Sequence, residues 1–274
     1  MNATPIITLT TDFATQDGYV AAMIGVILRQ CPSAHVVSIT HEVPPRDLRA
    51  AAWALRNAWP YFPAGTIHVV VVDPGVGSER RGILVRAARH TFIGPDNGLL
   101  LEAISGEMLD AVRELTNPAA RAAQPSPTFH GRDVFAWAAG WIAAGREWPA
   151  VGPPLPTGDL IRLPDLPPRV ERDADGATIT GAVMLADRFG NLITTITDEW
   201  LTSLFGKGVP QVSVNGQPIH LGRTFSDVAE GDAVAYVGSS GYLEIAVNSG
   251  SALELFGQAA EIVLKGHKET ASAA

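Results

Sequence analysis

The sequence predicts an α/β N-terminal domain with a mainly parallel sheet, followed by a smaller C-terminal domain of the antiparallel β-barrel type. Apolar runs alternate with helical patterns over the first half of the 274 residues, as in a sheet covered by helices. A proline-rich stretch follows, and beyond it the chain changes to short strands separated by tight turns. We therefore expect domains at 1–160 and 172–268, joined by a linker at 161–171 whose proline-rich character begins near residue 148.

The N-terminal domain is expected to begin with a strand, after which strands and helices follow one another. Its strands are expected at Ile6–Thr11, Val36–Thr40, Ile67–Val71, Ile83–Ala87 and Thr91–Ile93. Its first helix is expected to run through Leu28, and Pro32 stops the helical pattern. Further helices are expected at Leu48–Trp59, Leu99–Ile104 and Asp133–Ala144. Asp47 is the expected N-cap of the second helix. The β-branched run Ile67–Val71, interrupted only by His68, suits a strand buried on both faces.

Tight turns organise the second half of the chain. Strands are expected at Thr178–Leu185, Leu192–Ile196, Gln211–Val214, Pro218–Leu221, Ala233–Val237 and Leu243–Val247, with short helices at Asp198–Leu204 and Ser251–Leu255. The dipeptide Asn215-Gly216 predicts a type I′ hairpin, because both of its residues tolerate positive φ. This pattern of short strands indicates a small barrel or sandwich.

Composition excludes several classes of function. A net charge of −8 argues against a nucleic-acid partner, which requires clustered Lys and Arg. The longest apolar stretch, Val20–Leu28, is far too short to span a membrane. Cys31 is the single cysteine and the first residues carry no basic charge, so we expect no disulfide, no signal peptide and a cytoplasmic location.

Polar residues lie where the predicted strands end, and these are the candidate functional residues. Asp73 comes at the end of the buried strand Ile67–Val71, after Val72, and a Pro-Gly turn leads from it to Arg80. Open α/β sheets bind ligands at the carboxyl ends of their strands, although an ordinary turn with a capping aspartate would read the same way. Asp12 ends the first strand, and His130 lies in a proline-rich loop.

No phosphate loop, cysteine cluster or nucleophile elbow occurs in the sequence. A hydrolytic metal site built from Asp12, Asp73, Asp96 and His130 stays open as a minor alternative, because such sites usually contain more than one histidine or a close carboxylate pair. We expect no metal and no redox cofactor.

Six motifs, in order and spacing, resemble a known family. They are TLTTDFATQDGY, VVDPGVGSERRG, IGPDNGLL, TFHGRDVF, DRFGNLITTI and SSGYLEIAVNSGSA, and together they extend over about residues 6–264. The resemblance is to the S-adenosylmethionine hydroxide adenosyltransferases, or S-adenosylmethionine hydrolases, which are relatives of fluorinating and chlorinating enzymes. It implies attack of water or hydroxide on C5′ of S-adenosylmethionine, giving adenosine and methionine.

The resemblance also implies roles for individual residues. The family's catalytic set falls on Asp73, Arg80 and His130. Its substrate contacts fall on Asp12 for the ribose, Asp17 near the methionine, and Asp187, Phe189, Asn191, Ser239, Glu244, Val247 and Ser249 in the second domain. It further implies a homotrimer with its active sites between subunits.

The same residues bear on two alternatives to hydrolysis, halide transfer and binding without turnover. The halogenating relatives carry Tyr where Asp73 stands, a small hydroxyl residue where Val76 stands and Ser where Gly131 stands, so halide transfer is disfavoured. A protein that binds S-adenosylmethionine or adenosine without turnover is the other alternative. It would have no need of the set Asp73, Arg80 and His130.

Overall fold

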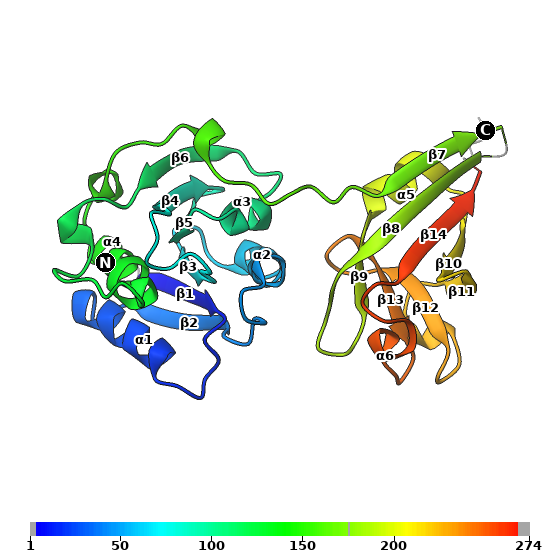
Figure 1. Cartoon of the computed structure of the whole chain (residues 1–274), viewed down its shortest axis with the longest axis horizontal. Helices are drawn as coiled ribbons and strands as arrows, with labels where there is room; N and C mark the ends of the chain where they lie inside the picture. Colours follow the sequence, from blue (N-terminus) through cyan, green and yellow to red (C-terminus); the bar gives the residue numbers. More distant parts are fainter. Residues whose placement is uncertain (1–3, 175, 268–274) are drawn as a thin grey trace. The chain divides into compact units, whose positions relative to one another are not determined.

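The protein is described by a computed structural model that covers residues 4–174 and 176–267. Its chain divides into two compact units, one ending at Leu163 and one beginning at Pro164 (Figure 1). The outer limits expected for the two domains, residues 1 and 268, lie outside the described residues. Each unit has a hydrophobic core of its own.

The first unit is built on one six-stranded mixed sheet. Its strands are β1 (Ile6–Thr11), β2 (His35–Thr40), β3 (Ile67–Val71), β4 (Gly82–Ala87), β5 (His90–Pro95) and β6 (Leu109–Glu114), in the order β2-β1-β3-β5-β4-β6. The pairs β1–β2, β1–β3 and β3–β5 are parallel, whereas β4 is antiparallel to both of its neighbours. The mainly parallel sheet is therefore confirmed, and β6 is a strand that the sequence did not reveal.

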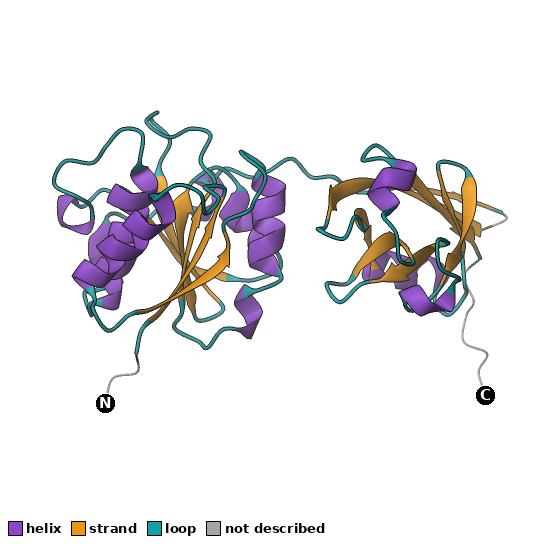
Figure 2. Ribbon diagram, turned by 90° about the horizontal axis from the view of Figure 1, so that it is seen from below, coloured by secondary structure: helices purple, strands orange, loops and turns teal. Residues whose placement is uncertain are grey.

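Helices cover both faces of this sheet (Figure 2). The helix α1 (Tyr19–Gln30) and the helix α4 (Trp137–Ala143) share one core with β1 and β3. On the other face α2 (Leu48–Arg56) and α3 (Leu99–Ala103) share a second core. Asp47 caps α2 as expected, since its side chain accepts a hydrogen bond from the Ala50 N–H at 2.9 Å.

Two helices differ from their expected limits. The helix α2 ends at Arg56 rather than Trp59, and a 3₁₀ turn, Trp59–Tyr61, replaces its last residues. Pro60 explains the change, because its ring would clash with the carbonyl of residue 56 in a continued α-helix. The expected helix Asp133–Ala144 begins earlier, as a π-helix over Gly131–Ala136 that continues into α4.

The proline-rich stretch up to Leu163 packs on the first unit. Leu155 donates a backbone hydrogen bond to Val112 of β6, and Val151 is fully buried. Short 3₁₀ turns lie at Pro118–Ala120, Trp148–Val151 and Thr157–Asp159. The strand β7 (Arg169–Asp173) begins inside the range 161–171 that was expected as linker.

The second unit is a closed seven-stranded barrel. Its strands are β8 (Gly176–Ala186), β9 (Leu192–Thr197), β10 (Gln211–Val214), β11 (Gln217–Leu221), β12 (Ala233–Val237), β13 (Tyr242–Val247) and β14 (Glu261–Gly266), in the order β14-β10-β11-β12-β13-β9-β8. Pairing of β14 with β8 closes the barrel, and β7 extends the sheet beside β8. The helices α5 (Asp198–Phe205) and α6 (Ala252–Phe256) and a 3₁₀ turn, Phe225–Asp227, lie between the strands.

One strand pair of the barrel is parallel. The pair β11–β12 has parallel register, and the other pairs around the barrel are antiparallel. An odd number of strands cannot close with antiparallel pairs alone, so seven strands require such an exception. Asn215 and Gly216 have φ values of 50° and 80°, as the predicted type I′ hairpin requires.

Among the residues that the structure describes, no helix is both long enough and apolar enough to cross a membrane.

Candidate active site

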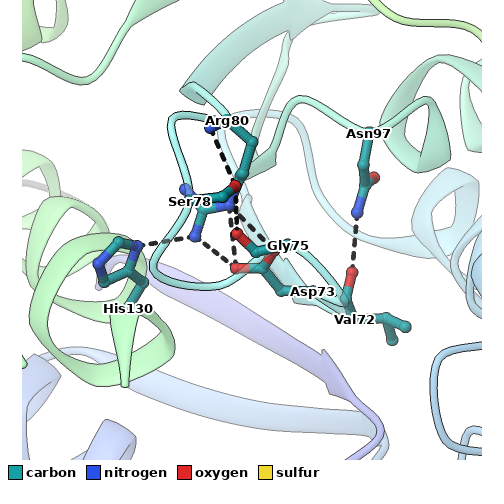
Figure 3. Close-up of polar contacts among 7 residues, drawn as sticks. All are labelled: Val72, Asp73, Gly75, Ser78, Arg80, Asn97 and His130. Carbon is teal, nitrogen blue, oxygen red and sulfur yellow. Dashed lines mark hydrogen bonds and ion pairs between the residues drawn. The ribbon is translucent and has the colours of Figure 1, made fainter. Parts of the chain in front are cut away.

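Asp73 and Arg80 are placed by the turn that joins β3 to β4. The strand β3 is buried along its whole length, and Asp73 follows it after Val72. Two hydrogen bonds stabilise the turn. The Val76 N–H donates to the Asp73 carbonyl (3.2 Å), and the Ser78 hydroxyl donates to the Gly75 carbonyl (2.7 Å). The turn returns the chain so that the Arg80 side chain lies over Asp73 (Figure 3).

Arg80 binds Asp73 through two of its nitrogens. Its Nε donates to both carboxylate oxygens, at 2.9 Å and 3.1 Å, and its Nη2 donates to Oδ2. The two side chains are 11% and 5% exposed, so the pair is almost fully removed from water. The guanidinium also lies over the buried ring of Phe135, with 5.1 Å between Cζ and the ring centroid. Arg80 is therefore held in one orientation.

His130 completes the set. The Nη2 of Arg80 donates a hydrogen bond of 2.8 Å to His130 Nδ1, as Figure 3 shows. Since arginine can only donate, Nδ1 must accept, and the ring proton of the neutral imidazole is then on Nε2. Burial and the neighbouring Arg80 charge lower the pKa of His130 below its ordinary value, although Asp73 and Asp133 oppose this. The neutral form is the one that the contact with Arg80 requires.

The loop that carries His130 is fastened at two points. Asp133 accepts a hydrogen bond of 2.8 Å from the Ser126 N–H, and its other oxygen binds Arg132. Gly77, with φ of +79°, lies against the same loop, because an added Cβ would stand 2.7 Å from the Pro127 carbonyl oxygen. The turn after β3 and the loop before the π-helix thus pack backbone against backbone.

Asp73 and His130 open onto a cavity of about 330 Å³ in the first unit. Its lining residues are Asp12, Phe13, Tyr19, Arg46, Val71, Asp73, Val76, Thr128, Phe129, His130 and Gly131. Two carboxylates face it, and the rings of Phe13, Tyr19 and Phe129 meet edge to face, with centroids 5.2–6.0 Å apart. Carboxylates and aromatic faces together favour a cationic organic ligand.

Asp12 lies in this cavity, and Asp17 does not. The Asp12 Oδ2 accepts a hydrogen bond of 2.9 Å from the Arg46 N–H, and Asp17 is exposed outside the lining. Arg46 is a lining residue that sequence reasoning missed. Its φ of +67° is unusual for a residue other than glycine, and a sequence carries no signal for such a conformation.

Asp96 has a structural role. Its buried carboxylate accepts hydrogen bonds from Arg81 Nε (3.0 Å) and from the Ile161 N–H (3.1 Å), and it does not line the cavity. Within residues 4–174 and 176–267, no three His, Cys, Asp or Glu side chains are grouped so that they could hold a metal ion. Asp12, Asp73, Asp96 and His130 do not form the ligand cluster that the metal alternative required.

In the second unit, Asp187, Phe189 and Asn191 belong to one turn between β8 and β9. The Asp187 carboxylate accepts from the N–H groups of Phe189 (2.8 Å) and Asn191 (2.9 Å) and from Asn191 Nδ2 (2.8 Å). Asn191 is buried, whereas Phe189 is 79% exposed. The turn rests on α6, because Gly190 accepts a hydrogen bond of 2.9 Å from the Leu253 N–H.

The remaining predicted residues lie on or beside β13, which pairs with β9. Glu244 accepts a hydrogen bond of 3.1 Å from the Tyr236 hydroxyl, and burial together with the charge of Asp187 raises its pKa despite that bond. The Val247 side chain is buried. Ser239 and Ser249 are exposed, before and after the strand. The predicted residues of the second unit thus gather on two neighbouring strands and their turns.

The chain is similar to known proteins over most of its length. Residues 7–152 match the model of the SAM hydroxide adenosyltransferase N-terminal domain, and residues 181–263 match that of the C-terminal domain. A protein of Salinispora arenicola named (R)-S-adenosyl-L-methionine hydrolase is 43% identical over 256 residues, which cover 93% of this chain and 95% of that protein. A protein of Nocardia brasiliensis named fluorinase is 30% identical, covering 90% of this chain and 91% of its own.

A solved structure has the same fold. The crystal structure of an uncharacterized conserved protein from Thermotoga maritima superposes with a TM-score of 0.83 at 34% identity, covering 94% of this chain and 99% of that one. Both units thus match the models of one family. The chain belongs to the SAM hydroxide adenosyltransferase family.

Proposed function

We propose that the protein hydrolyses S-adenosyl-L-methionine to adenosine and L-methionine by attack of water or hydroxide at C5′. The observation that carries the proposal is the Asp73–Arg80–His130 set at a cavity lined by two carboxylates and three aromatic rings. The sulfonium of S-adenosylmethionine is the kind of organic cation that such a lining favours. The names of relatives such as the Salinispora hydrolase support the same reaction.

The reaction balances without a redox partner. The attacking oxygen forms a bond to C5′, the C5′–S bond breaks, and its electron pair leaves with the neutral thioether of methionine. The water loses one proton in the process. Charge disappears as hydroxide meets the sulfonium, so a site of low polarity favours the transition state over the separated ions.

The contacts indicate how the three residues divide the work. His130 uses Nδ1 to accept from Arg80, so its Nε2–H is left to donate to the nucleophilic oxygen. Asp73 is then the group that accepts the proton of the water. Arg80 holds both partners and supplies positive charge beside the developing hydroxide. We propose that the three act as one unit.

We assign substrate binding as follows. Asp12 holds the ribose diol, because a carboxylate can accept two hydroxyl hydrogen bonds. Asp17 and the second-unit residues Asp187, Phe189, Asn191, Ser239, Glu244, Val247 and Ser249 contact the methionine and adenine groups. The sulfonium sulfur is a stereocentre, and the relatives are named for its (R) epimer, so we propose that epimer as the preferred substrate.

Incubation with each separated epimer in ¹⁸O-water, read by mass spectrometry, tests the function. We expect ¹⁸O at the 5′ position of adenosine, together with methionine, and faster turnover of the (R) epimer. Unchanged substrate that nevertheless binds would mean that the protein is a binding protein and not a hydrolase.

The surroundings of Gly131 also disfavour halide transfer. The halogenating relatives carry Ser at this position, and here a Cβ at residue 131 would stand 3.2 Å from the Phe13 ring and 3.3 Å from Val71.

Three further properties complete the proposal. The reaction requires no metal or cofactor, so activity should be unaffected by a chelator. The active enzyme is a homotrimer, for which a molar mass from light scattering is the test. The single, reduced Cys31 suits a cytoplasmic location.

The acid limb of the pH profile should report His130. Its pKa is lowered, so the neutral ring persists as the pH falls below the ordinary value of about 6.5, and activity is lost only as the pH passes through the lowered value. We expect the acid limb of kcat/KM to have its midpoint below pH 6.5. A midpoint above that pH would mean that protonation of His130 does not limit the reaction.

Substitution of Gly77 by alanine should impair turnover from outside the cavity. The new Cβ would meet the Pro127 carbonyl at 2.7 Å and push away the loop that carries His130. A displacement of this kind lowers kcat by ~10–100-fold. Gly65→Ala is the matched control, because Gly65 also has positive φ (+92°) but has open space around it. Equal activity of the two variants would contradict the coupling between the turn and the loop.

A further inference from the structure

His41 is a buried titratable side chain that the proposed reaction does not use. It follows β2 directly and is 6% exposed. Its Nδ1 is 2.9 Å from the Thr11 hydroxyl and its Nε2 is 2.7 Å from the Ser38 hydroxyl. A neutral imidazole can accept at one nitrogen and donate from the other, so the two hydroxyls satisfy the whole ring. Burial lowers the pKa of His41, against an opposing influence of Glu42, which favours this neutral form.

The Thr11 contact leads directly to the cavity. The strands β1 and β2 are parallel neighbours (Figure 1). Thr11 ends β1 and His41 follows β2, and their side chains are in hydrogen-bond contact. The Thr11 hydroxyl also accepts a hydrogen bond of 3.3 Å from the Phe13 N–H, which fixes the backbone on the far side of Asp12. Asp12 therefore lies between Thr11, whose hydroxyl contacts His41, and Phe13, whose N–H donates to the same Thr11 hydroxyl.

The backbone from His41 to Arg46 makes two more hydrogen bonds to the loop that carries Asp12. The His41 carbonyl accepts a hydrogen bond of 2.8 Å from the Ala14 N–H, and the Arg46 N–H donates to Asp12 Oδ2 at 2.9 Å. Both donors have positive φ, 52° at Ala14 and 67° at Arg46. Such conformations cost free energy in residues other than glycine and persist where neighbouring contacts hold them. Hydrogen bonds therefore fix the loop that carries Asp12 against the loop after β2.

We propose that His41 is a positioning residue that fixes the Asp12 loop for binding of the substrate ribose. The proposal rests on the proposed function, since it takes Asp12 as the ribose ligand. His41 does not line the cavity and acts through Thr11 and through its own carbonyl. Its loss should weaken binding of any ligand that carries the ribose and should leave the chemical step at Asp73 and His130 nearly unchanged.

The chain contains a matched pair for comparison. The Thr8 hydroxyl is 2.8 Å from His68 Nδ1, so Thr8 and His68 form a second buried Thr–His contact, three residues earlier on β1. Both members are fully buried, and neither lines the cavity. A purely structural role for buried Thr–His contacts would make the two pairs equivalent, whereas a positioning role distinguishes them.

The test compares variants of the full chain by adenosine affinity and by steady-state kinetics. His41→Phe and Thr11→Val remove the contact, and we expect each to raise the adenosine Kd and the KM about tenfold, as for loss of one buried hydrogen bond, with kcat changed about twofold at most. Combined, they should raise Kd by less than the product of the two single effects, because the Thr11–His41 contact is common to both, while the bonds of Thr11 to Phe13 and of His41 to Ser38 are lost in one variant each. The controls His68→Phe and Thr8→Val should leave Kd and KM unchanged.

Conservative variants add a second discrimination. The amide of His41→Asn can reach the position of Nδ1 and keep the bond to Thr11, whereas His41→Gln reaches the position of Nε2 and keeps the bond to Ser38. We expect His41→Asn to restore most of the affinity and His41→Gln to remain weak. If His41→Phe does not fold, the comparison of His41→Asn with His41→Gln gives the answer, because Thr11→Val also removes the bond from the Phe13 N–H.

The outcomes separate this inference from the proposed function. Unchanged Kd in folded Thr11→Val and His41→Phe would overturn it, as would a loss of kcat with Kd unchanged or equal effects in the Thr8 and His68 controls. If the wild-type protein binds adenosine but forms no product, the proposed hydrolysis fails while the Kd comparison still decides the role of His41. Absence of both adenosine binding and product formation in the wild-type protein would overturn both.

Discussion

Replacement of Arg80 by lysine is expected to lower kcat by ~10³-fold or more, since the guanidinium is the common partner of the other two proposed catalytic groups, Asp73 and His130. A lysine ammonium cannot donate from two fixed nitrogens to the Asp73 carboxylate and also reach His130 Nδ1. Without the contact at Nδ1, the imidazole is free to change its tautomer and orientation. KM should change far less than kcat.

The neighbouring residue supplies the control. Arg81 also binds a buried aspartate, with its Nε 3.0 Å from Asp96 Oδ2, but that pair lies outside the cavity lining. Arg81→Lys should therefore lower the free energy of unfolding and leave kcat near the wild-type value. Equal losses of kcat in the two variants would mean that Arg80 has only a structural role.

A double-mutant cycle extends this result to the whole set. Asp73→Asn and His130→Ala each remove one partner of Arg80, and residues that act as a unit give strongly non-additive losses. We expect the double variant to be little slower than the slower single variant. Additive losses in kcat would count against a single catalytic unit.

Substitution of Gly190 by alanine is expected to destabilise the second unit by ~3 kcal/mol or more, from positive φ together with steric overlap. Gly190 has φ of +81°, and an added Cβ would stand 2.1 Å from Ser251 Oγ and 2.8 Å from Ser251 Cβ. The turn of Asp187 and Asn191 would have to leave α6. Binding of substrate should weaken for the same reason.

Gly216 is the matched control for this substitution. Its φ of +80° is almost the same, but no atom lies within 4 Å of an added Cβ. Gly216→Ala should therefore cost only ~1–2 kcal/mol, the strain of a left-handed residue. Chemical denaturation followed by the fluorescence of Trp200, the one tryptophan after Leu163, measures both variants. Equal costs would rule out the contact with Ser251.

The sequence predicted the strands that are buried on both faces. The run Ile67–Val71 is apolar because helices cover both sides of β3, and its end marked Asp73. Three strands with exposed residues, β6, β7 and β14, were missed, although others such as β2 were predicted. In β6, Leu109–Glu114, charged and apolar residues mix, and β7 is mostly charged, so neither gave a clear apolar pattern.

Features that depend on contacts between distant segments could not be predicted in the same way. The position of β5 between β3 and β4, and the parallel pair β11–β12, follow from packing of the whole sheet rather than from local periodicity. Arg46 lines the cavity because Asp12 holds its N–H. His41 gave no signal, since its role depends on Thr11, thirty positions away in the chain.

The charged strand β7 bears on how copies of this protein behave at high concentration. Among the described residues its strand pairing is with β8 alone, so β7 is an edge strand of its sheet. Four of its five residues are charged, namely Arg169, Glu171, Arg172 and Asp173, and Pro167 and Pro168 precede it. Charges and prolines at an open edge oppose the addition of a strand from another molecule. The charged strand beside the barrel therefore protects the protein against aggregation through sheet extension.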